Sequence, residues 1–148
     1  MGDSTKVEVF LNTKIEQEGE VQKIEEHYFG AISKIDEDIM LQYYESDDKS
    51  KLVTFSFYQN GIFRLQRKGN PEMDFIFDQK RDYLAGTYAT DEIGQMNIQI
   101  RTFKQKLRID DLNQKGQVAI DYQLINGQIE FGKFALNLLF QPSSDSKS

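Results

Sequence analysis

Apolar residues recur at every second position along most of this chain, and this alternation limits the fold more than any other feature. In the first run, Val7, Val9, Leu11 and Ile15 share one face of an extended segment, and Phe10 is the apolar exception on the other face. The same pattern returns in residues 53–58, 63–66, 96–101 and 118–124. A period of two places one face of a β-strand on a core and the other in water. The sequence therefore predicts antiparallel β-strands, and no segment shows a convincing helical period.

Asn-Gly pairs separate several of these runs. Asn60-Gly61 and Asn126-Gly127 each lie between two apolar segments. Asn-Gly accepts the positive φ angles of a type I′ turn, which makes it a strong hairpin signal. Further short connections are expected at residues 18–20, 36–38, 46–48, 69–71 and 112–116. These turns divide the chain into about ten strands, joined in sequence by short loops.

A long series of antiparallel strands must protect its edges, and closure of the sheet removes them. Consecutive hairpins favour an all-β fold with a single antiparallel up-and-down barrel of about 8–10 strands, with a two-sheet sandwich as the alternative. A barrel of about eight strands has an interior that is filled by side chains or holds one small ligand.

The alternation changes parity at two places. Ile98 and Ile100 are even positions, whereas Phe103, Leu107 and Ile109 are odd. A second change separates residues 129–131 from the even positions of 134–140. A slip of one residue turns every later side chain to the other face, so β-bulges are expected near Thr102 and at Gly132.

The length of 148 residues suits one domain. We expect a barrel over residues 1–141 and a flexible polar tail over 142–148. The chain has no cysteine, its first residues are polar, and no stretch is long and apolar enough for a membrane span. These features predict a soluble, cytoplasmic protein. The net charge of −6 makes nucleic acid an unlikely main partner.

Several segments, in this order, resemble the YwiB-like family of small bacterial proteins. The matching segments are Leu41-Gln42-Tyr43-Tyr44-Glu45, residues 111–116, residues 117–122 and the apolar strand 134–140. The resemblance covers nearly the whole chain. It implies a calycin, or lipocalin-like, β-barrel and a bacterial cytoplasmic origin, and it assigns no catalytic residues. The chain lacks the Gly-x-Trp signature of secreted lipocalins, since it contains no tryptophan.

Motifs for catalysis or metal binding are not found. His27 is the only histidine, whereas ordinary metal sites use several His or Cys ligands. The acidic segments 36–38 and 47–48 lack the spacing of a calcium loop and are interpreted as solvated turns. We therefore expect no catalytic residue, no metal and no cofactor, and an enzyme is the weakest interpretation.

Four residues are candidates for binding a ligand inside the barrel: Glu26, Tyr28, Tyr43 and Tyr122. Tyrosines at inward positions offer hydroxyl groups in an apolar lumen, although a filled aromatic core is the simpler alternative. One strand register places Glu26 and Tyr28 inside, where the carboxylate would need a partner. The other register places His27 inside instead.

The middle of the chain, residues 62–108, is its only basic part, with nine basic and six acidic side chains. Five of these cations are candidates for an anion or partner surface: Arg64, Arg101, Lys104, Lys106 and Arg108. A bulge near Thr102 would turn Lys104, Lys106 and Arg108 outward on one strand. A solvated strand face, or protection against edge pairing, is the alternative.

Two hypotheses for function follow. The first is a barrel that binds a small apolar or amphipathic molecule in its lumen. The second is a protein-interaction or assembly module with a filled barrel, acting through an exposed face as a homodimer or with another protein. Interior volume separates them, since only the first hypothesis needs an open lumen.

Overall fold

The computed structural model describes residues 4–143 as a β-structure without α-helices. The ten strands are β1 (Ser4–Gln17), β2 (Glu20–Ile35), β3 (Asp38–Tyr44), β4 (Leu52–Phe57), β5 (Phe63–Arg67), β6 (Glu72–Phe77), β7 (Leu84–Thr90), β8 (Gly94–Asp110), β9 (Lys115–Asn126) and β10 (Ile129–Pro142). The described residues accordingly contain no helix capable of crossing a bilayer. Strand β10 continues through Pro142, one residue past the expected domain boundary, and residues 144–148 of the expected tail lie outside the described residues.

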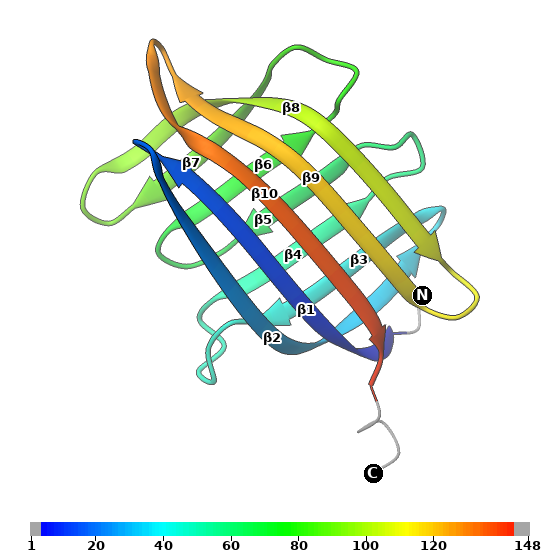
Figure 1. Cartoon of the computed structure of the whole chain (residues 1–148). Helices are drawn as coiled ribbons and strands as arrows, with labels where there is room; N and C mark the ends of the chain where they lie inside the picture. The colour runs from blue at the N-terminus through cyan, green and yellow to red at the C-terminus, as the bar shows by residue number, and fades with distance from the viewer. Residues whose placement is uncertain (1–3, 144–148) are drawn as a thin grey trace.

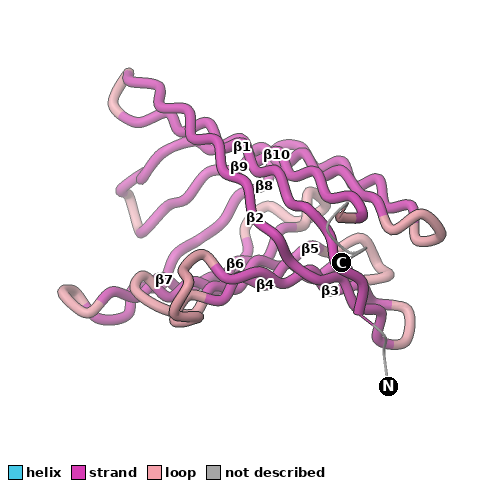
Figure 2. Tube along the Cα trace, turned by 90° about the horizontal axis from the view of Figure 1, so that it is seen from below, coloured by secondary structure: helices cyan, strands magenta, loops and turns pink. Residues whose placement is uncertain are grey.

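Every strand pairs antiparallel with its neighbour in sequence, and β1 pairs with β10 to close the barrel. This arrangement confirms the up-and-down barrel and excludes the sandwich. Five long strands, β1, β2, β8, β9 and β10, have 12 to 17 residues each. The other five have 5 to 7. Figure 1 shows the long strands in front of β3–β6, and Figure 2 shows β1, β9 and β10 on one side of the barrel, β4–β6 on the other, and β2 running between them.

Both predicted bulges are present. The register between β8 and β9 shifts between Thr102 and Lys104, and that between β9 and β10 shifts between Glu130 and Gly132. Phe103 is the extra residue of the first bulge and lies exposed, although alternation groups it with the inward-facing Leu107. An extra bulge residue has no partner across the ladder, so its side chain need not follow the parity of its neighbours.

The Asn-Gly hairpins form, but their predicted turn type is wrong. A type I′ turn needs positive φ at both central residues. Asn126 pairs with Ile129, so the central residues of that hairpin are Gly127 and Gln128, and only Gly127 has positive φ, at 62°. In the other connection Gly61 has φ of 88°, whereas Asn60 does not have positive φ. The β4–β5 connection is a longer loop, closed by a hydrogen bond from the Tyr58 amide to the Ile62 carbonyl.

One end of the barrel is packed solid with aromatic rings. Phe63 lies 5.1 Å from Phe57 and 5.8 Å from Phe77, measured between ring centroids, and Phe57 lies 6.0 Å from Phe140. Gly116 faces Phe140 so closely that a Cβ atom there would overlap the ring. This end, which carries the β4–β5 and β8–β9 loops, is therefore largely a filled core, and the larger open volume lies toward the other end.

Candidate functional site

A cavity of about 570 Å³ occupies the other end of the barrel interior. We call it the lumen cavity, and its mouth lies among the β1–β2, β7–β8 and β9–β10 turns. Its lining side chains come from β1 and from β3 to β10, and most are apolar, such as Leu11, Ile98 and Leu136. The interior is thus half filled core and half cavity, a combination that neither sequence hypothesis had stated.

Tyr122 forms the floor of the lumen cavity. Its ring stacks on Phe134 at 5.1 Å and meets Phe77, in the filled core, edge-on at 4.7 Å. Phe134 lines the cavity but Phe77 does not. Tyr122 is only 6% exposed, and its ring lies at the boundary between packed rings and open volume.

A row of neighbouring side chains lines one side of the cavity, from β3 to β7. In successive strand pairs from β3 to β7, Tyr43 lies opposite Val53, Val53 opposite Arg67, Arg67 opposite Met73, and Met73 opposite Tyr88. All five line the cavity. Two phenols and one guanidinium group therefore stand at the same level of an otherwise apolar wall.

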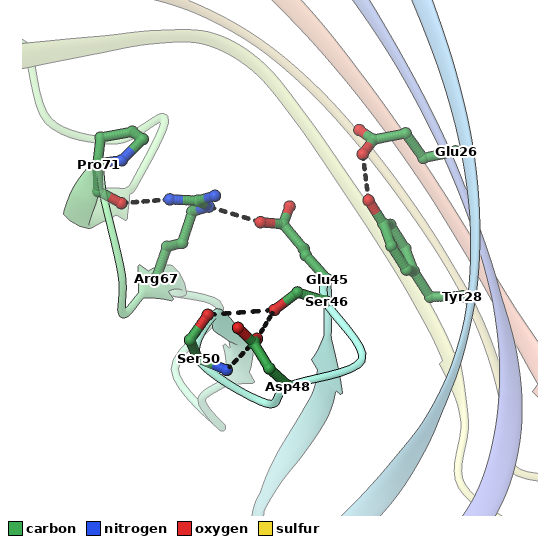
Figure 3. A network of polar contacts seen from close by, with 8 residues as sticks. All are labelled: Glu26, Tyr28, Glu45, Ser46, Asp48, Ser50, Arg67 and Pro71. Atoms are coloured by element: carbon green, nitrogen blue, oxygen red, sulfur yellow. Dashed lines mark hydrogen bonds and ion pairs between the residues drawn. The ribbon is translucent and has the colours of Figure 1, made fainter.

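The structure shows which residues of β2 face into the barrel. Glu26 and Tyr28 lie opposite the buried residues Leu11 and Val9, so both face inward, and His27 faces outward. Tyr28 stacks on Tyr43 at 4.5 Å and donates a hydrogen bond from its hydroxyl to the Glu26 carboxylate (Figure 3). Tyr43 and Tyr122 line the cavity itself, whereas Glu26 and Tyr28 stand beside Tyr43 and are not lining side chains.

Arg67 and Glu45 form an ion pair at the cavity wall that the sequence analysis did not select. Arg67 Nε donates to Glu45 Oε1 at 2.7 Å, and Arg67 Nη1 donates to the Pro71 carbonyl (Figure 3). The side chains are 14% and 19% exposed. The sequence contained a signal for Arg67. Phe63 and Leu65 face inward, and the alternation of β5 places Arg67 on the same face.

The loop after β3, which carries Glu45, is held by its own polar contacts. Ser46 Oγ donates to Asp48 Oδ1 at 2.7 Å, and the Ser50 amide donates to the same oxygen at 3.0 Å (Figure 3). The Glu45 amide donates to the Lys51 carbonyl at 2.8 Å. Hydrogen bonds from Ser46 and Ser50 lower the pKa of Asp48 from 3.8 to about 2.

Burial keeps the tyrosines of this region protonated. It raises the pKa of Tyr122, and it is also the largest cause of the raised pKa of Tyr43, with smaller contributions from the Glu45 and Glu26 carboxylates. Burial raises the pKa of Tyr28 as well, followed by its hydrogen bond to Glu26. All three phenols are therefore hydrogen-bond donors throughout the physiological pH range.

Four of the five candidate surface cations lie on the outer face of β8. Arg101, Lys104, Lys106 and Arg108 are all exposed, and the guanidinium group of Arg101 lies 5.1 Å from the Phe103 ring centroid. Arg64 lies apart from them on β5, which β6 and β7 separate from β8 in the barrel. It donates two hydrogen bonds to Asp74, at 2.9 and 2.7 Å, which neutralise its charge.

An aromatic stack lies on the outer face of β1 and β2. His27 lies 4.7 Å from Phe10 and 5.0 Å from Phe29, and its Nε2 atom is 3.1 Å from a carboxylate oxygen of Glu8. Phe29 is 55% exposed. Among residues 4–143, no group of three or more His, Cys, Asp or Glu side chains is placed to hold a metal ion.

Comparisons with known proteins support the fold and add no activity. Residues 9–138 match a family model described as "Domain of unknown function (DUF1934)". The crystal structure of the ywiB protein from Bacillus subtilis is similar, with a TM-score of 0.80 and 18% sequence identity over 95% of this chain and 94% of that chain. No curated protein matches this sequence. At this identity, the likeness to the ywiB structure concerns the fold.

Proposed function

Because the chain belongs to the DUF1934 family, whose description assigns no activity, we propose from its own geometry that the barrel binds one small apolar or amphipathic molecule in the lumen cavity. The observation that carries this proposal is the cavity itself. Small-molecule sites have volumes of roughly 300–1,000 Å³, mostly apolar walls and a few polar groups that orient the ligand. The lumen cavity, at about 570 Å³, has each of these properties.

The size of the apolar wall sets the expected affinity. Each methylene group moved from water into an apolar site contributes about 0.8 kcal/mol, so a ligand with eight such groups gains roughly 6 kcal/mol. The lost freedom of the ligand offsets part of this gain. We therefore expect dissociation constants in the micromolar range or weaker for simple alkyl probes, with tighter binding where polar groups also match.

Mass spectrometry of the full chain purified without denaturation tests this proposal. Spectra recorded first under native and then under denaturing conditions separate a bound molecule from a covalent modification. We expect a small molecule that leaves on unfolding, or one-to-one uptake of an added neutral probe such as Nile red. A protein that carries no molecule and takes up no apolar probe contradicts the proposal.

A protein-contact surface is the second candidate function, and the exposed stack of Phe10, His27 and Phe29 favours it. Exposed aromatic residues are enriched at protein interfaces. The exposed basic residues of β8 lie on the outer surface of the long strands, as the aromatic stack does. Strands β9 and β10 lie between β8 and β1. A second copy of this chain or another protein would be the partner.

A further inference from the structure

Two buried tyrosine hydroxyls of the lumen cavity have no hydrogen-bond partner in the described structure. Tyr43 is 2% exposed and Tyr122 is 6% exposed, and both line the cavity. Neither hydroxyl makes a hydrogen bond to any atom of residues 4–143. No fully enclosed side-chain polar atom in this part of the chain lacks a partner, so both hydroxyls must be accessible from the cavity. Buried hydroxyl groups normally make hydrogen bonds, and here the cavity is where a partner can be placed.

The charges of the lumen cavity cancel each other. Among its lining residues, Arg67 is the only cation and Glu45 the only anion. They are paired at 2.7 Å, and Arg67 also donates to the Pro71 carbonyl. An ionised ligand would therefore enter an apolar cavity with no unpaired charge of opposite sign on its wall. Burying an ion under these conditions is strongly unfavourable.

A further carboxylate, outside the cavity lining, acts against an anion. The carboxylate of Glu26 binds the hydroxyl of Tyr28, whose ring stacks on Tyr43. Carboxylates of both Glu45 and Glu26 act electrostatically on the Tyr43 hydroxyl and favour its protonated form, each more strongly than Arg67 opposes it. A negative charge brought to that hydroxyl would meet the same repulsion. What the two phenols offer, by contrast, is an O–H group that donates to an uncharged oxygen.

We propose that the ligand of the lumen cavity is an uncharged, mainly apolar molecule with an acceptor oxygen, such as a ketone, ester or ether, that accepts hydrogen bonds from Tyr43 and Tyr122. This inference rests on the proposed lumen-binding function and specifies its ligand class. It places the apolar body of the ligand against side chains such as Leu11 and Leu136. It also distinguishes this cavity from a carboxylate-binding site, which would need an unpaired cation.

Calorimetric titration of the full chain at neutral pH with three probes of equal chain length tests this assignment. The probes are methyl octyl ketone, decanoate and decylammonium, used below the concentrations at which they aggregate. We expect the ketone to bind at least about tenfold more tightly than either ion, because one buried, unpaired charge outweighs one neutral hydrogen bond. Equal or tighter binding of decanoate or decylammonium overturns the assignment.

Tyrosine variants identify the donors. We expect Tyr43→Phe and Tyr122→Phe each to weaken ketone binding about threefold to tenfold, the usual effect of one neutral hydrogen bond. Tyr44→Phe is the matched control, because Tyr44 follows Tyr43 in β3 but points outward. Thermal unfolding of each variant confirms that it is folded. Unchanged ketone affinity in the Tyr43→Phe/Tyr122→Phe double variant overturns the assignment, whereas failure of every probe and of Nile red to bind overturns the proposed function as well.

Discussion

The ring of Tyr122 meets the ring of Phe77 edge-on at a centroid distance of 4.7 Å, and this contact marks where the filled core ends and the lumen cavity begins. Phe77 is fully buried among other phenylalanines. Tyr122 has a packed ring on one side and open volume on the other. The two halves of the interior should therefore respond differently to the loss of side-chain volume.

Truncation in the filled core should be costly. Phe63→Ala removes a fully buried ring that contacts Phe55, Phe57 and Phe77. We expect a loss of about 3–5 kcal/mol in the free energy of unfolding, because a new cavity forms where atoms were closely packed. Met96→Ala is the matched variant at the cavity wall and should cost less than about 2 kcal/mol, since Met96 already borders open volume. Urea denaturation measures both, and equal losses would show that the two halves are packed alike.

The ion pair between Arg67 and Glu45 should stabilise the mouth of the cavity. Glu45→Gln leaves the largely buried Arg67 without its carboxylate partner, and we expect a loss of roughly 1–3 kcal/mol in the free energy of unfolding. The Glu45→Gln/Arg67→Met double variant should recover part of that loss, because no unpaired charge remains.

The pair of Arg64 and Asp74 is the control for that measurement. It also joins an arginine to a carboxylate, here through two hydrogen bonds, but its side chains are 31% and 37% exposed. Asp74→Asn should therefore cost less than about 1 kcal/mol. A larger loss for Asp74→Asn than for Glu45→Gln would contradict the assignment of the mouth pair as the more buried interaction.

The loop after Glu45 should respond to acid through Asp48. Its pKa in the folded protein is about 2, below its usual value of 3.8. A lowered folded-state pKa means that the ionised group contributes stability above pH 3.8, and that this contribution is lost as the pH falls toward 2. NMR titration of the Ser50 amide should show a midpoint near pH 2, and Ser46→Ala should move it upward. A midpoint near 3.8 in the unchanged protein would exclude the hydrogen bonds from Ser46 and Ser50.

The aromatic stack on the outer face should be separable from the lumen. Phe29→Lys removes the most exposed ring of the stack, and we expect little change in the affinity for neutral probes, because Phe29 points away from the cavity. If the second candidate function holds, the same variant should weaken self-association at least tenfold in sedimentation equilibrium. Loss of probe binding in a folded Phe29→Lys variant would contradict the separation of the two surfaces.

Much of the fold could be predicted from the sequence because period-two alternation reports directly which face a residue occupies. The barrel, both bulges and the inward position of Tyr43 and Tyr122 are confirmed. The resemblance to the YwiB-like family is confirmed by the family match and the similar solved structure.

How the interior is filled could not be predicted in the same way. Phe75 and Phe77 have the same parity, yet Phe75 lines the cavity and Phe77 belongs to the filled core. The difference depends on strand stagger, which determines the side chains that meet across the lumen. For the same reason, alternation places Arg67 inside without indicating that Glu45 is its partner. Arg64 belongs to the same basic part of the sequence as the cations of β8. It does not lie beside them in the barrel, because β6 and β7 separate β5 from β8.

Ligand entry into the lumen is the central claim, and tryptophan fluorescence measures it most directly because the chain contains no tryptophan of its own. Tyr88→Trp places one indole at the cavity wall, and Asn97→Trp places one on the exposed outer face of β8. Titration with methyl octyl ketone should change the emission of the Tyr88→Trp protein with saturation, and leave the Asn97→Trp protein unchanged. If neither protein shows a saturable change in emission, or if both show an equal change, binding within the barrel is contradicted.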